Sequence, residues 1–444
     1  MALKKKKEEP TVTSKRLSGA HVPHNKNTTH CAPVRIPVPA KVRIPMSMHI
    51  GAPCTPTVKV GDLVQVGQPI GEAGGFVSAP IHSSVSGKVT AVEDMLMANG
   101  GMSRAVVIET DGEQTVWEGV KPPHVEDTAS FIDAVRQSGL VGLGGAGFPT
   151  SVKLSVKDPT QVDYLLINGA ECEPFITSDV QTMLNDADYV FKGAALIRKY
   201  VGAKNIVIGI EDNKPEAIEL FRKRAGELEN FSVAAMPSLY PQGGEKVMIY
   251  NITGRIVGEG KLPIDVGCIV MNVTSLAFLA KYMETGMPLV EKCVTIDGSA
   301  IAKPCNVIAP IGTSIHDIIE AAGGCKATPR KYLLGGAMMG MAAGSDELPM
   351  VKNTNAILVF DEKDAVLPAP SACINCGRCI DACPLNLMPN RINRAYKNRD
   401  AAALTRLKVN LCMECGCCSF VCPAKRELVL TNKLSKAFLR EQPK

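Results

Sequence analysis

The sequence predicts a chain of several domains, in which β-rich modules lie on either side of an α/β layer domain and a cysteine-rich module comes last. Three observations predict this fold class. The 444 residues exceed the roughly 250–300 at which a single hydrophobic core stops growing. The pattern changes along the chain from short alternating runs to strands that alternate with helices. Eight of the sixteen cysteines fall into two copies of one motif near the C-terminus.

Composition and charge describe an ordinary globular protein. The apolar fraction is 45% and the charged fraction is 21%, both close to the average for soluble domains. The net charge of +5 is modest, and its most visible basic run, Lys4–Lys7, lies in a polar N-terminal tail. Because residues 1–30 offer little apolar surface to bury, we expect them to be disordered. No nucleic-acid-binding motif is visible, so we expect no nucleic acid as a partner.

The sequence predicts no membrane-spanning helix. The longest apolar candidate, residues 267–282, is interrupted by Asn272, Thr274 and Ser275 and falls short of the roughly 20 residues needed to cross a bilayer. Cysteines with cluster-ligand spacing indicate a reducing compartment, since disulfides form in oxidising ones. We therefore expect a cytoplasmic protein whose association with a membrane is peripheral.

Residues 31–112 predict a small all-β module. Val58–Val64 and Gly87–Val92 alternate between apolar and polar residues, with glycine and proline between the short runs. The arrangement of these runs resembles the barrel-sandwich hybrid of biotinyl and lipoyl domains. Those domains carry a Met-Lys-Met tip for a swinging arm, whereas His82–Ser86 stand at this place. A covalent carrier role is therefore not expected.

Residues 125–286 predict an α/β layer domain. Asp127 can cap a helix that ends near Gly139, Tyr164–Ile167 and Ile206–Ile210 are typical of buried strands, and Pro215 suits the first turn of a helix. Residues 290–360 then return to short strands, with one helix near residues 314–322 and a glycine cluster at residues 335–340.

The cysteine motif predicts two [4Fe–4S] clusters. The copies read Cys373-x2-Cys376-x2-Cys379-x3-Cys383-Pro384 and Cys412-x2-Cys415-x2-Cys418-x3-Cys422-Pro423. In this bacterial-ferredoxin motif three close thiolates hold one cluster, and the cysteine before proline ligates the other. Zinc usually takes paired C-x2-C knuckles, so two complete copies make zinc or disulfides a remote alternative. The motif indicates one-electron transfer.

The spacing also predicts which cysteines share a cluster. Cys422 should join the first triplet and Cys383 the second, while Cys417 lies outside the triplet spacing and is expected not to bind iron. The two copies are joined by a helical stretch, with Ile392 and Leu404 on spaced turns. This linker is longer than in hairpin ferredoxins, so residues 366–433 are predicted to form a helical dicluster domain.

A glycine-rich loop follows the first predicted helix of the α/β domain. Residues 142–147 match G-x-G-x-x-G, but the dinucleotide fingerprint requires a strand before it, and here a helix precedes it. An ordinary Rossmann loop is therefore not supported. Consecutive glycines still let backbone N–H groups approach phosphate oxygens, and Lys153 adds a positive charge one turn later. The alternative is a tight turn between domains.

Polar and acidic residues follow the predicted strands. Such strand ends are where α/β sheets bind ligands, so these segments and the glycine loop are predicted to converge on one pocket. The candidate cofactor-binding residues are Gly142, Gly144, Gly145, Gly147, Lys153, Asn168, Glu171, Glu173, Gly243, Gly244, Glu245, Asn272 and Thr274.

These segments resemble the flavin-carrying, NADH-oxidising subunit of respiratory complex I. That family shows a Gly-Gly-Ala-Gly-Phe-Pro-Thr loop, an Asn-x-x-Glu-x-Glu-Pro segment and further Gly-Glu and Asn-Val segments. The resemblance implies non-covalent FMN, with NADH as the substrate. It implies that the glycine loop and Lys153 hold FMN phosphate and NADH, that the two asparagines contact FMN, and that the three glutamates line the nicotinamide and ribose side. The chain departs from the family at Ala170, where an acid is usual, and at Phe175, where glycine is usual.

Over residues 31–430 the chain resembles the RnfC family of the Rnf complex, a membrane-bound NADH:ferredoxin oxidoreductase that pumps Na⁺ or H⁺. The resemblance implies a barrel-sandwich hybrid, a Rossmann-like FMN/NADH domain, a β-grasp soluble-ligand-binding domain and a dicluster ferredoxin domain, in that order. It implies part of an enzyme at the cytoplasmic side of the cell membrane, with other subunits of the complex as partners and ferredoxin reached through them. Hydride transfer belongs to FMN, so no catalytic side chain is expected.

Two alternatives remain open from the sequence. The flavin and iron–sulfur cobalamin reductase of diol-degrading microcompartments shares the same parts. A non-catalytic scaffold that passes electrons between partners would use the glycine loop only as structure.

Overall fold

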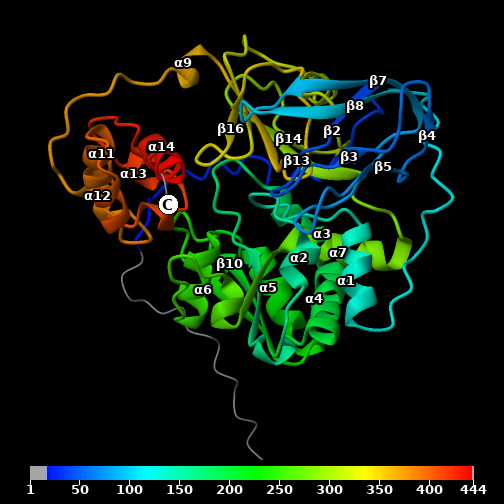
Figure 1. The fold of residues 1–444 in the computed structure, drawn as a ribbon, viewed down its shortest axis with the longest axis horizontal. Helices are drawn as coiled ribbons and strands as arrows, with labels where there is room; N and C mark the ends of the chain where they lie inside the picture. The colour runs from blue at the N-terminus through cyan, green and yellow to red at the C-terminus, as the bar shows by residue number, and fades with distance from the viewer. Residues whose placement is uncertain (1–17, 443–444) are drawn as a thin grey trace, which may run out of the picture.

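The computed structural model describes residues 18–442, which form four modules and an N-terminal segment. Figure 1 shows the α/β domain below, two β-rich modules above it and the helical cysteine module (residues 366–442) to one side. The basic run Lys4–Lys7 lies outside the described residues. None of the helices in the described part of the chain is long and apolar enough to cross a membrane.

The barrel-sandwich module contains two small antiparallel sheets, with strand orders β2-β8-β7-β4 and β3-β5-β6. The hairpin of β7 and β8 is its longest feature, and Val89 and Ile108 face the core from it. The expected alternation over Val58–Val64 yields only a two-residue strand, because residues 60–61 form a turn and Gly61 has a φ of +98°. The strands are β2 (Lys41–Pro45), β3 (Thr55–Pro56), β4 (Leu63–Val64), β5 (Pro69–Glu72), β6 (Ile81–His82), β7 (Gly87–Leu96) and β8 (Met102–Thr110).

The α/β domain is built on a parallel sheet with the order β11-β10-β9-β12. The chain winds outward from β9 and then returns to its other side with β12, so the order reverses beside β9, where such sheets bind ligands. The strands are β9 (Tyr164–Gly169), β10 (Asn205–Glu211), β11 (Phe231–Met236) and β12 (Cys268–Asn272). The helices are α1 (Thr128–Gln137), α2 (Thr150–Leu154), α3 (Ser178–Asn185), α4 (Ala187–Val201), α5 (Pro215–Arg224), α6 (Glu245–Thr253) and α7 (Val273–Thr285).

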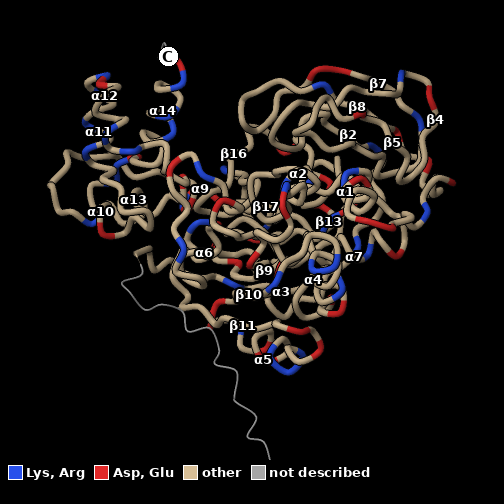
Figure 2. The backbone as a smooth tube through the Cα atoms, turned by 60° about the horizontal axis from the view of Figure 1, so that its bottom comes forward, with Lys and Arg blue, Asp and Glu red and all other residues tan. Residues whose placement is uncertain are grey.

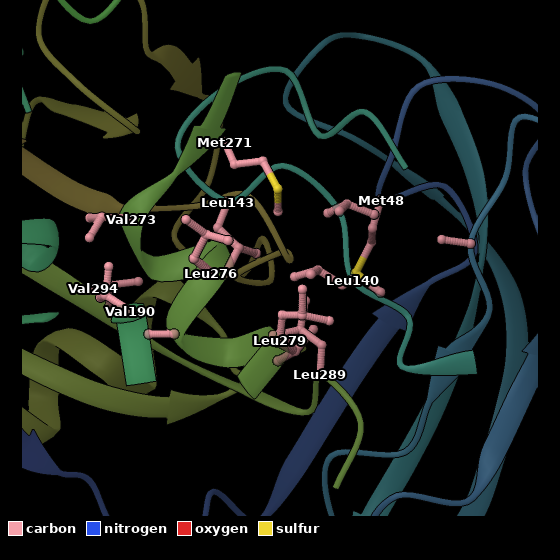
Figure 3. Packing of buried hydrophobic residues seen from close by; sticks show 14 of the residues in the cluster. Met48, Leu140, Leu143, Val190, Met271, Val273, Leu276, Leu279, Leu289 and Val294 are labelled. Carbon is pink, nitrogen blue, oxygen red and sulfur yellow. The ribbon is translucent and has the colours of Figure 1, made fainter. Parts of the chain in front are cut away.

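Alternating side chains of these strands cover two separate cores. Leu165 and Ile167 pack with residues of α3, α4, α5 and α7, whereas Leu166 and Val207 pack with α6 on the other face. The larger core continues into the neighbouring modules. Figure 3 shows Leu279 of α7 beside Leu140 and near Met48 of the barrel-sandwich module. The α/β, barrel-sandwich and β-grasp modules therefore share one apolar interior, whereas the cysteine module has clusters of its own.

Several local sequence signals are confirmed by the structure. The side chain of Asp127 accepts a hydrogen bond from the backbone N–H of Ser130 at the start of α1. Pro215 is the first residue of α5, and Ser314 caps α8. Each residue satisfies or avoids a backbone donor that the first helical turn leaves free.

The β-grasp module holds a six-stranded mixed sheet with the order β1-β14-β13-β17-β15-β16. Its edge strand β1 comes from residues 34–35 and pairs in parallel with β14, so the sheet includes residues that the sequence placed in the barrel-sandwich module. The elements are β1 (Val34–Arg35), β13 (Glu291–Asp297), β14 (Cys305–Pro310), α8 (Ile315–Ala321), β15 (Lys331–Leu334), β16 (Met341–Ala343), β17 (Ala356–Phe360) and α9 (Glu362–Ala365).

The cysteine module is helical, as predicted. Each cysteine run contains one short helix, and a glycine with a φ near +80° precedes it: Gly377 before α10 and Gly416 before α13. Glycine adopts this left-handed conformation without the steric cost that a Cβ brings. The helices are α10 (Arg378–Asp381), α11 (Pro389–Lys397), α12 (Ala401–Arg406), α13 (Cys417–Phe420) and α14 (Leu428–Glu441).

The predicted disorder of residues 1–30 is wrong for residues 18–30. We call residues 19–31 the N-terminal strap. Ala20 pairs with Tyr240, and Ala20, Val22 and Thr28 are buried. The segment has few apolar residues, as the composition indicated, but hydrogen bonds hold it to residues 171–181, Asn213, Tyr240, Asp297 and Asn306. Residues 1–17 lie outside the described part.

Candidate cofactor sites

The predicted ligand-binding segments come together at the carboxyl ends of β9 and β12. Asn168 lies at the end of β9 directly opposite Asn272 at the end of β12. The Asn168 amide donates to the carbonyl oxygen of Gly243 at 2.8 Å. Lys153 donates to Glu245 at 3.1 Å and to the Val270 carbonyl at 2.9 Å. Three loops and α2 therefore meet at the point where the strand order reverses.

The glycine loop (residues 142–147) packs against the start of α7. A Cβ at Gly144 would lie only 2.5 Å from Nδ2 of Asn272, whereas a Cβ at Gly145 would meet no atom within 4 Å. Gly142 donates to the Phe148 carbonyl at 2.9 Å, which closes the loop. Only glycine permits the approach at residue 144, and the space beside residue 145 is open. These features fit a loop that a phosphate or flavin approaches closely.

Asn272 and Thr274 are held by one acid. The Asn272 side chain caps α7 through the N–H groups of Thr274 and Ser275 and donates to Asp179 at 2.7 Å. The Thr274 hydroxyl donates to the other oxygen of Asp179 at 2.7 Å. Asp179 therefore fixes both predicted side chains relative to α3.

The two acids of the acidic loop (residues 168–176) point in different directions. The Glu171 carboxylate accepts from the backbone N–H of Asp179 at 2.6 Å, at the start of α3. This orientation differs from the expectation that Glu171 faces a ligand. Glu173 accepts from the backbone N–H of Met338 at 2.9 Å and lies 3.2 Å from the Tyr240 hydroxyl. Burial raises the pKa of Glu173, which favours its protonated form.

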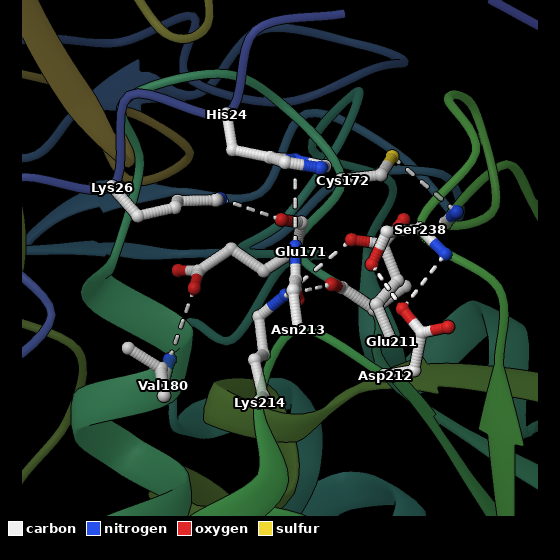
Figure 4. A network of polar contacts seen from close by, with 12 residues as sticks. His24, Lys26, Glu171, Cys172, Val180, Glu211, Asp212, Asn213, Lys214 and Ser238 are labelled. Carbon is white, nitrogen blue, oxygen red and sulfur yellow. Dashed lines mark hydrogen bonds and ion pairs between the residues drawn. The ribbon is translucent and has the colours of Figure 1, made fainter. Parts of the chain in front are cut away.

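Lys26, which is partly buried, and the buried Lys214 hold the backbone of the acidic loop (Figure 4). Lys26 of the strap uses its three donors on the carbonyl oxygens of Glu171, Glu173 and Ile176, at 2.6–2.8 Å. Lys214 donates to the Ala170 carbonyl at 2.7 Å. Burial lowers the pKa of Lys26 to about 8 and raises that of Glu171 to about 7, because each loses hydration in its charged form.

The Lys26 contacts support a strained backbone. Glu171 has a φ of +45° and Phe175 a φ of +70°, a region that a bulky side chain rarely adopts. Phe175 stands where the related family has glycine, which adopts this conformation freely. Its ring packs edge-on against Phe360, with 5.7 Å between centroids, and its N–H donates to the His24 carbonyl at 2.9 Å.

Side chains of the β-grasp module hold the glycine loop and the residues before it in the same way, by donating to backbone carbonyl oxygens. Lys292 donates to the Leu143 carbonyl at 2.8 Å, Asn353 to the Gly145 carbonyl at 3.0 Å and Lys352 to the Gly139 carbonyl at 2.7 Å. Burial lowers the pKa of Lys292 to about 8. The N–H groups of Gly142 and Leu143 donate to the Phe148 carbonyl and the Ser275 hydroxyl, so the N–H groups of residues 144–147 are the ones left for another partner.

Sequence reasoning missed these supporting residues. Lys292 carried a signal, because it alternates with Val294 and Ile296 on the buried face of β13. A lysine at an inward position of an alternating strand is unusual and needs a partner. Lys26 carried no signal, since a lone lysine in a polar tail is normally solvated.

The eight predicted cluster ligands surround two separate cavities. Cys373, Cys376, Cys379 and Cys422 line one of about 370 Å³. Cys383, Cys412, Cys415 and Cys418 line the other, of about 320 Å³, and Cys417 lines it as well; both volumes include space open to solvent. In the described part of the chain, no three His, Cys, Asp or Glu side chains converge closely enough to hold one metal ion. Four thiols around a larger space fit a multi-iron cluster, whose ligands stand farther apart than those of a single zinc ion.

The two cavities differ in their surroundings. The loop of Cys412–Cys418 touches the α/β domain: a Cβ at Gly244 would lie 2.2 Å from Cε of Met413, and the Tyr240 hydroxyl lies 2.8 Å from the Cys415 carbonyl oxygen. We call this cavity proximal and the other distal. At the distal cavity Cys373 and Cys376 are exposed. Figure 1 shows the cysteine module joined to the rest of the protein on the side of α6.

Cys417 lines the proximal cavity together with the four predicted ligands, and its thiol interacts with that of Cys415. The same thiol donates to the Tyr240 carbonyl at 3.6 Å, and the residue is fully buried with Ala20, Val22 and Tyr240. Cys417 therefore packs between the strap and α13, and its exclusion from iron binding stays a prediction.

Comparison with known proteins finds matches to four family models. They are the RnfC barrel sandwich hybrid domain over residues 15–113, the Nuo51 FMN-binding domain over 135–281, the SLBB domain over 293–342 and the 4Fe-4S dicluster domain over 365–423.

Two curated relatives match over most of their length. One belongs to the Na(+)-translocating ferredoxin:NAD(+) oxidoreductase complex of Acetobacterium woodii and is 44% identical over 84% of this chain and 85% of its own. The other belongs to the proton-translocating ferredoxin:NAD(+) oxidoreductase complex of Clostridium ljungdahlii and is 41% identical over 84% and 83%. Among solved structures, an NAD⁺-reducing [NiFe]-hydrogenase in the H₂-reduced state matches 70% of this chain and 61% of its own, with 20% identity and a TM-score of 0.46.

Replacing two neighbouring cysteines one at a time should show which of them binds a cluster and which only packs. Cys418→Ala should lose about half of the bound iron, the share of one of two clusters. Cys417→Ala should keep the full iron content, because its thiol contacts a carbonyl oxygen. Iron and acid-labile sulfide per chain, measured after anaerobic reconstitution, give the result. Equal iron loss in both variants would contradict the assignment of Cys417.

Proposed function

The chain belongs to the RnfC family of ion-translocating ferredoxin:NAD⁺ oxidoreductase complexes, and from this premise we propose that it carries electrons between NADH and a membrane complex. The matched FMN-binding and dicluster domains give it FMN and two [4Fe–4S] clusters as cofactors. NAD(H) is the substrate at the α/β domain. Partner subunits exchange electrons with ferredoxin and couple this transfer to Na⁺ or H⁺ movement.

The observation that carries the proposal is the contact between the two cofactor regions. The acidic loop and the proximal cysteine loop meet at Tyr240, which contacts both Glu173 and the Cys415 carbonyl. FMN supplies the conversion of a two-electron hydride donor into single electrons. A cluster directly beside the flavin domain, and a second one at the protein surface, provide the path that these electrons need.

The predicted residues divide into two roles. Gly144, Gly145 and Gly147 present N–H groups to phosphate, Gly142 closes the loop through its bond to Phe148, and Lys153 supplies a positive charge. Asn168, Gly243, Gly244, Glu245, Asn272 and Thr274 shape the flavin and nicotinamide pocket at the strand ends. Glu171 orients α3 and, through it, Asp179. Glu173 connects the acidic loop to the β-grasp and cysteine modules.

The cellular location that we propose follows from the same family. We propose a peripheral protein at the cytoplasmic side of the cell membrane, bound to the other subunits of the complex. Of the two alternatives, the cobalamin reductase is disfavoured by the identity to members of ion-translocating complexes, and a scaffold without flavin is disfavoured by the FMN-binding domain.

Titration with NADH tests the proposed function. Anaerobic NADH should bleach the flavin absorbance of the purified holoprotein and then reduce both clusters. Lys153→Ala should weaken FMN or NADH binding by about 10- to 100-fold, because a charged hydrogen bond contributes about 1.5–3 kcal/mol, and should leave the iron content unchanged. Protein that binds no flavin and does not respond to NADH would refute the enzyme assignment. Equal loss of iron in the variant would indicate misfolding instead.

Lys292→Met tests whether the β-grasp module supports the glycine loop. Removing the donor leaves the buried Leu143 carbonyl without its lysine partner, so FMN affinity should fall by about tenfold or more. Lys292→Arg should restore much of it, since a guanidinium can reach the same carbonyl. FMN dissociation, followed by fluorescence, and iron content are the two measurements. Unchanged FMN affinity in Lys292→Met would show that the loop holds its shape without this contact.

A further inference from the structure

Charge is segregated along the chain. Residues 366–444 contain 13 lysines and arginines against 5 acids, a net charge of +8, whereas residues 1–365 contain 36 against 39, a net charge of −3. The cysteine module is therefore a basic body attached to a slightly acidic one. Figure 2 shows the basic positions along α11, α12 and α14.

The exposed end of this basic module contains the distal cavity. Its ligands Cys373 and Cys376 are exposed, and Ile374 between them is 67% exposed. The preceding segment, residues 366–377, has no helix or strand and exposes Val366 and Leu367 as well. Of these exposed apolar side chains, Ile374 lines the distal cavity itself, and a large apolar side chain in solvent beside a redox site fits a contact surface.

Three exposed basic residues flank this cavity. Arg378, Arg391 and Lys425 each adjoin a residue that lines it, namely Cys379, Asn390 and Ala424. None of the three has a side-chain hydrogen bond or ion pair with any residue that the structure describes. Arg426, by contrast, lines the cavity and donates to Asn393 and to the Ser371 carbonyl.

Two acids share this region, Asp381 and Glu427, and both are exposed. The local balance therefore stays positive, with four basic side chains against two acidic ones. We name this surface the distal face: the mouth of the distal cavity, Ile374, Arg378, Arg391 and Lys425.

We propose that the distal face docks a one-electron redox protein or redox domain whose contact surface is acidic. The proposal rests on the proposed function, because it needs an electron to leave or enter through the distal cluster. Unpaired positive charges around a redox site raise the encounter rate with an oppositely charged partner. The exposed Ile374 side chain then gives short-range apolar contact, as in small transient electron-transfer interfaces. An anionic membrane would use the charges but could not exchange an electron.

The test uses the full holoprotein and a chemically reduced acidic ferredoxin as the probe, with NAD⁺ in excess and NADH formation as the readout. The variant Arg378→Glu/Arg391→Glu/Lys425→Glu should lower the second-order rate by about tenfold or more at low ionic strength. The wild-type rate should itself fall between about 0.01 M and about 0.15 M ionic strength, where the Debye length shortens from about 30 to about 8 Å.

A matched control changes the same amount of charge elsewhere. Lys59, Lys223 and Lys303 are exposed residues of the other three modules, and their triple replacement by glutamate should keep the wild-type rate. An equal loss in this control would show that only net charge matters and would overturn the proposal.

Two further outcomes separate this proposal from others. If NADH fails to reduce the flavin of wild-type protein, the proposed function itself is refuted. If NADH reduces flavin and clusters normally in both triple variants and the ferredoxin rate is unchanged, the docking proposal alone is refuted. Loss of sedimentation with phosphatidylserine vesicles in the distal variant, at an unchanged ferredoxin rate, would assign the face to lipid and would also overturn the proposal.

Discussion

The cofactor loops depend on buried ammonium groups that bind backbone carbonyls. Lys26 and Lys214 hold the acidic loop, while Lys292 and Lys352 hold the glycine loop and the residue before it. A buried carbonyl must find a donor, and a buried ammonium is tolerated only where acceptors surround it. In each lysine–carbonyl contact the carbonyl gains its donor and the ammonium group gains its acceptor, and the carbonyl points toward the lysine. The N–H groups that a phosphate needs are then left on the opposite side.

These lysines also explain why the modules occur together. Lys26 belongs to the N-terminal strap, and Lys292 and Lys352 to the β-grasp module, so neither loop is shaped by the α/β domain alone. The shared core through Met48, Leu140 and Leu279 joins the same modules by apolar contact. The barrel-sandwich hybrid lacks the Met-Lys-Met tip of carrier domains. Here this module and the β-grasp sheet both pack beside the α/β domain and help to fix the geometry of the loops.

The sequence predicts what is encoded locally and fails where distant residues decide. The cysteine spacing alone predicts that Cys422 joins the first triplet and Cys383 the second, as the cavities have them, because the motif encodes the geometry of the cluster. Helix starts such as those at Asp127 and Pro215 depend on neighbouring residues and can also be predicted from the sequence. The position of the strap cannot be predicted in this way, since its contacts lie from 145 to 278 residues along the chain and its composition suggests a segment exposed to solvent. Likewise the sequence predicts that Glu171 binds a ligand. In the structure its carboxylate accepts instead from the backbone N–H of Asp179, because α3 begins beside it.

The strap imposes an order on folding during synthesis. It is made before its partners Glu171, Tyr240 and Asn306, which leave the ribosome much later. Because domains generally fold as they are synthesised, the α/β sheet can form before its acidic loop has been fastened. The strap therefore emerges first but docks on segments that follow it by 145 residues or more, and its contacts with the β-grasp module can form only after that module has been made. Long-range closure of this kind is slow, so the acidic loop is fastened later than the sheet that carries it.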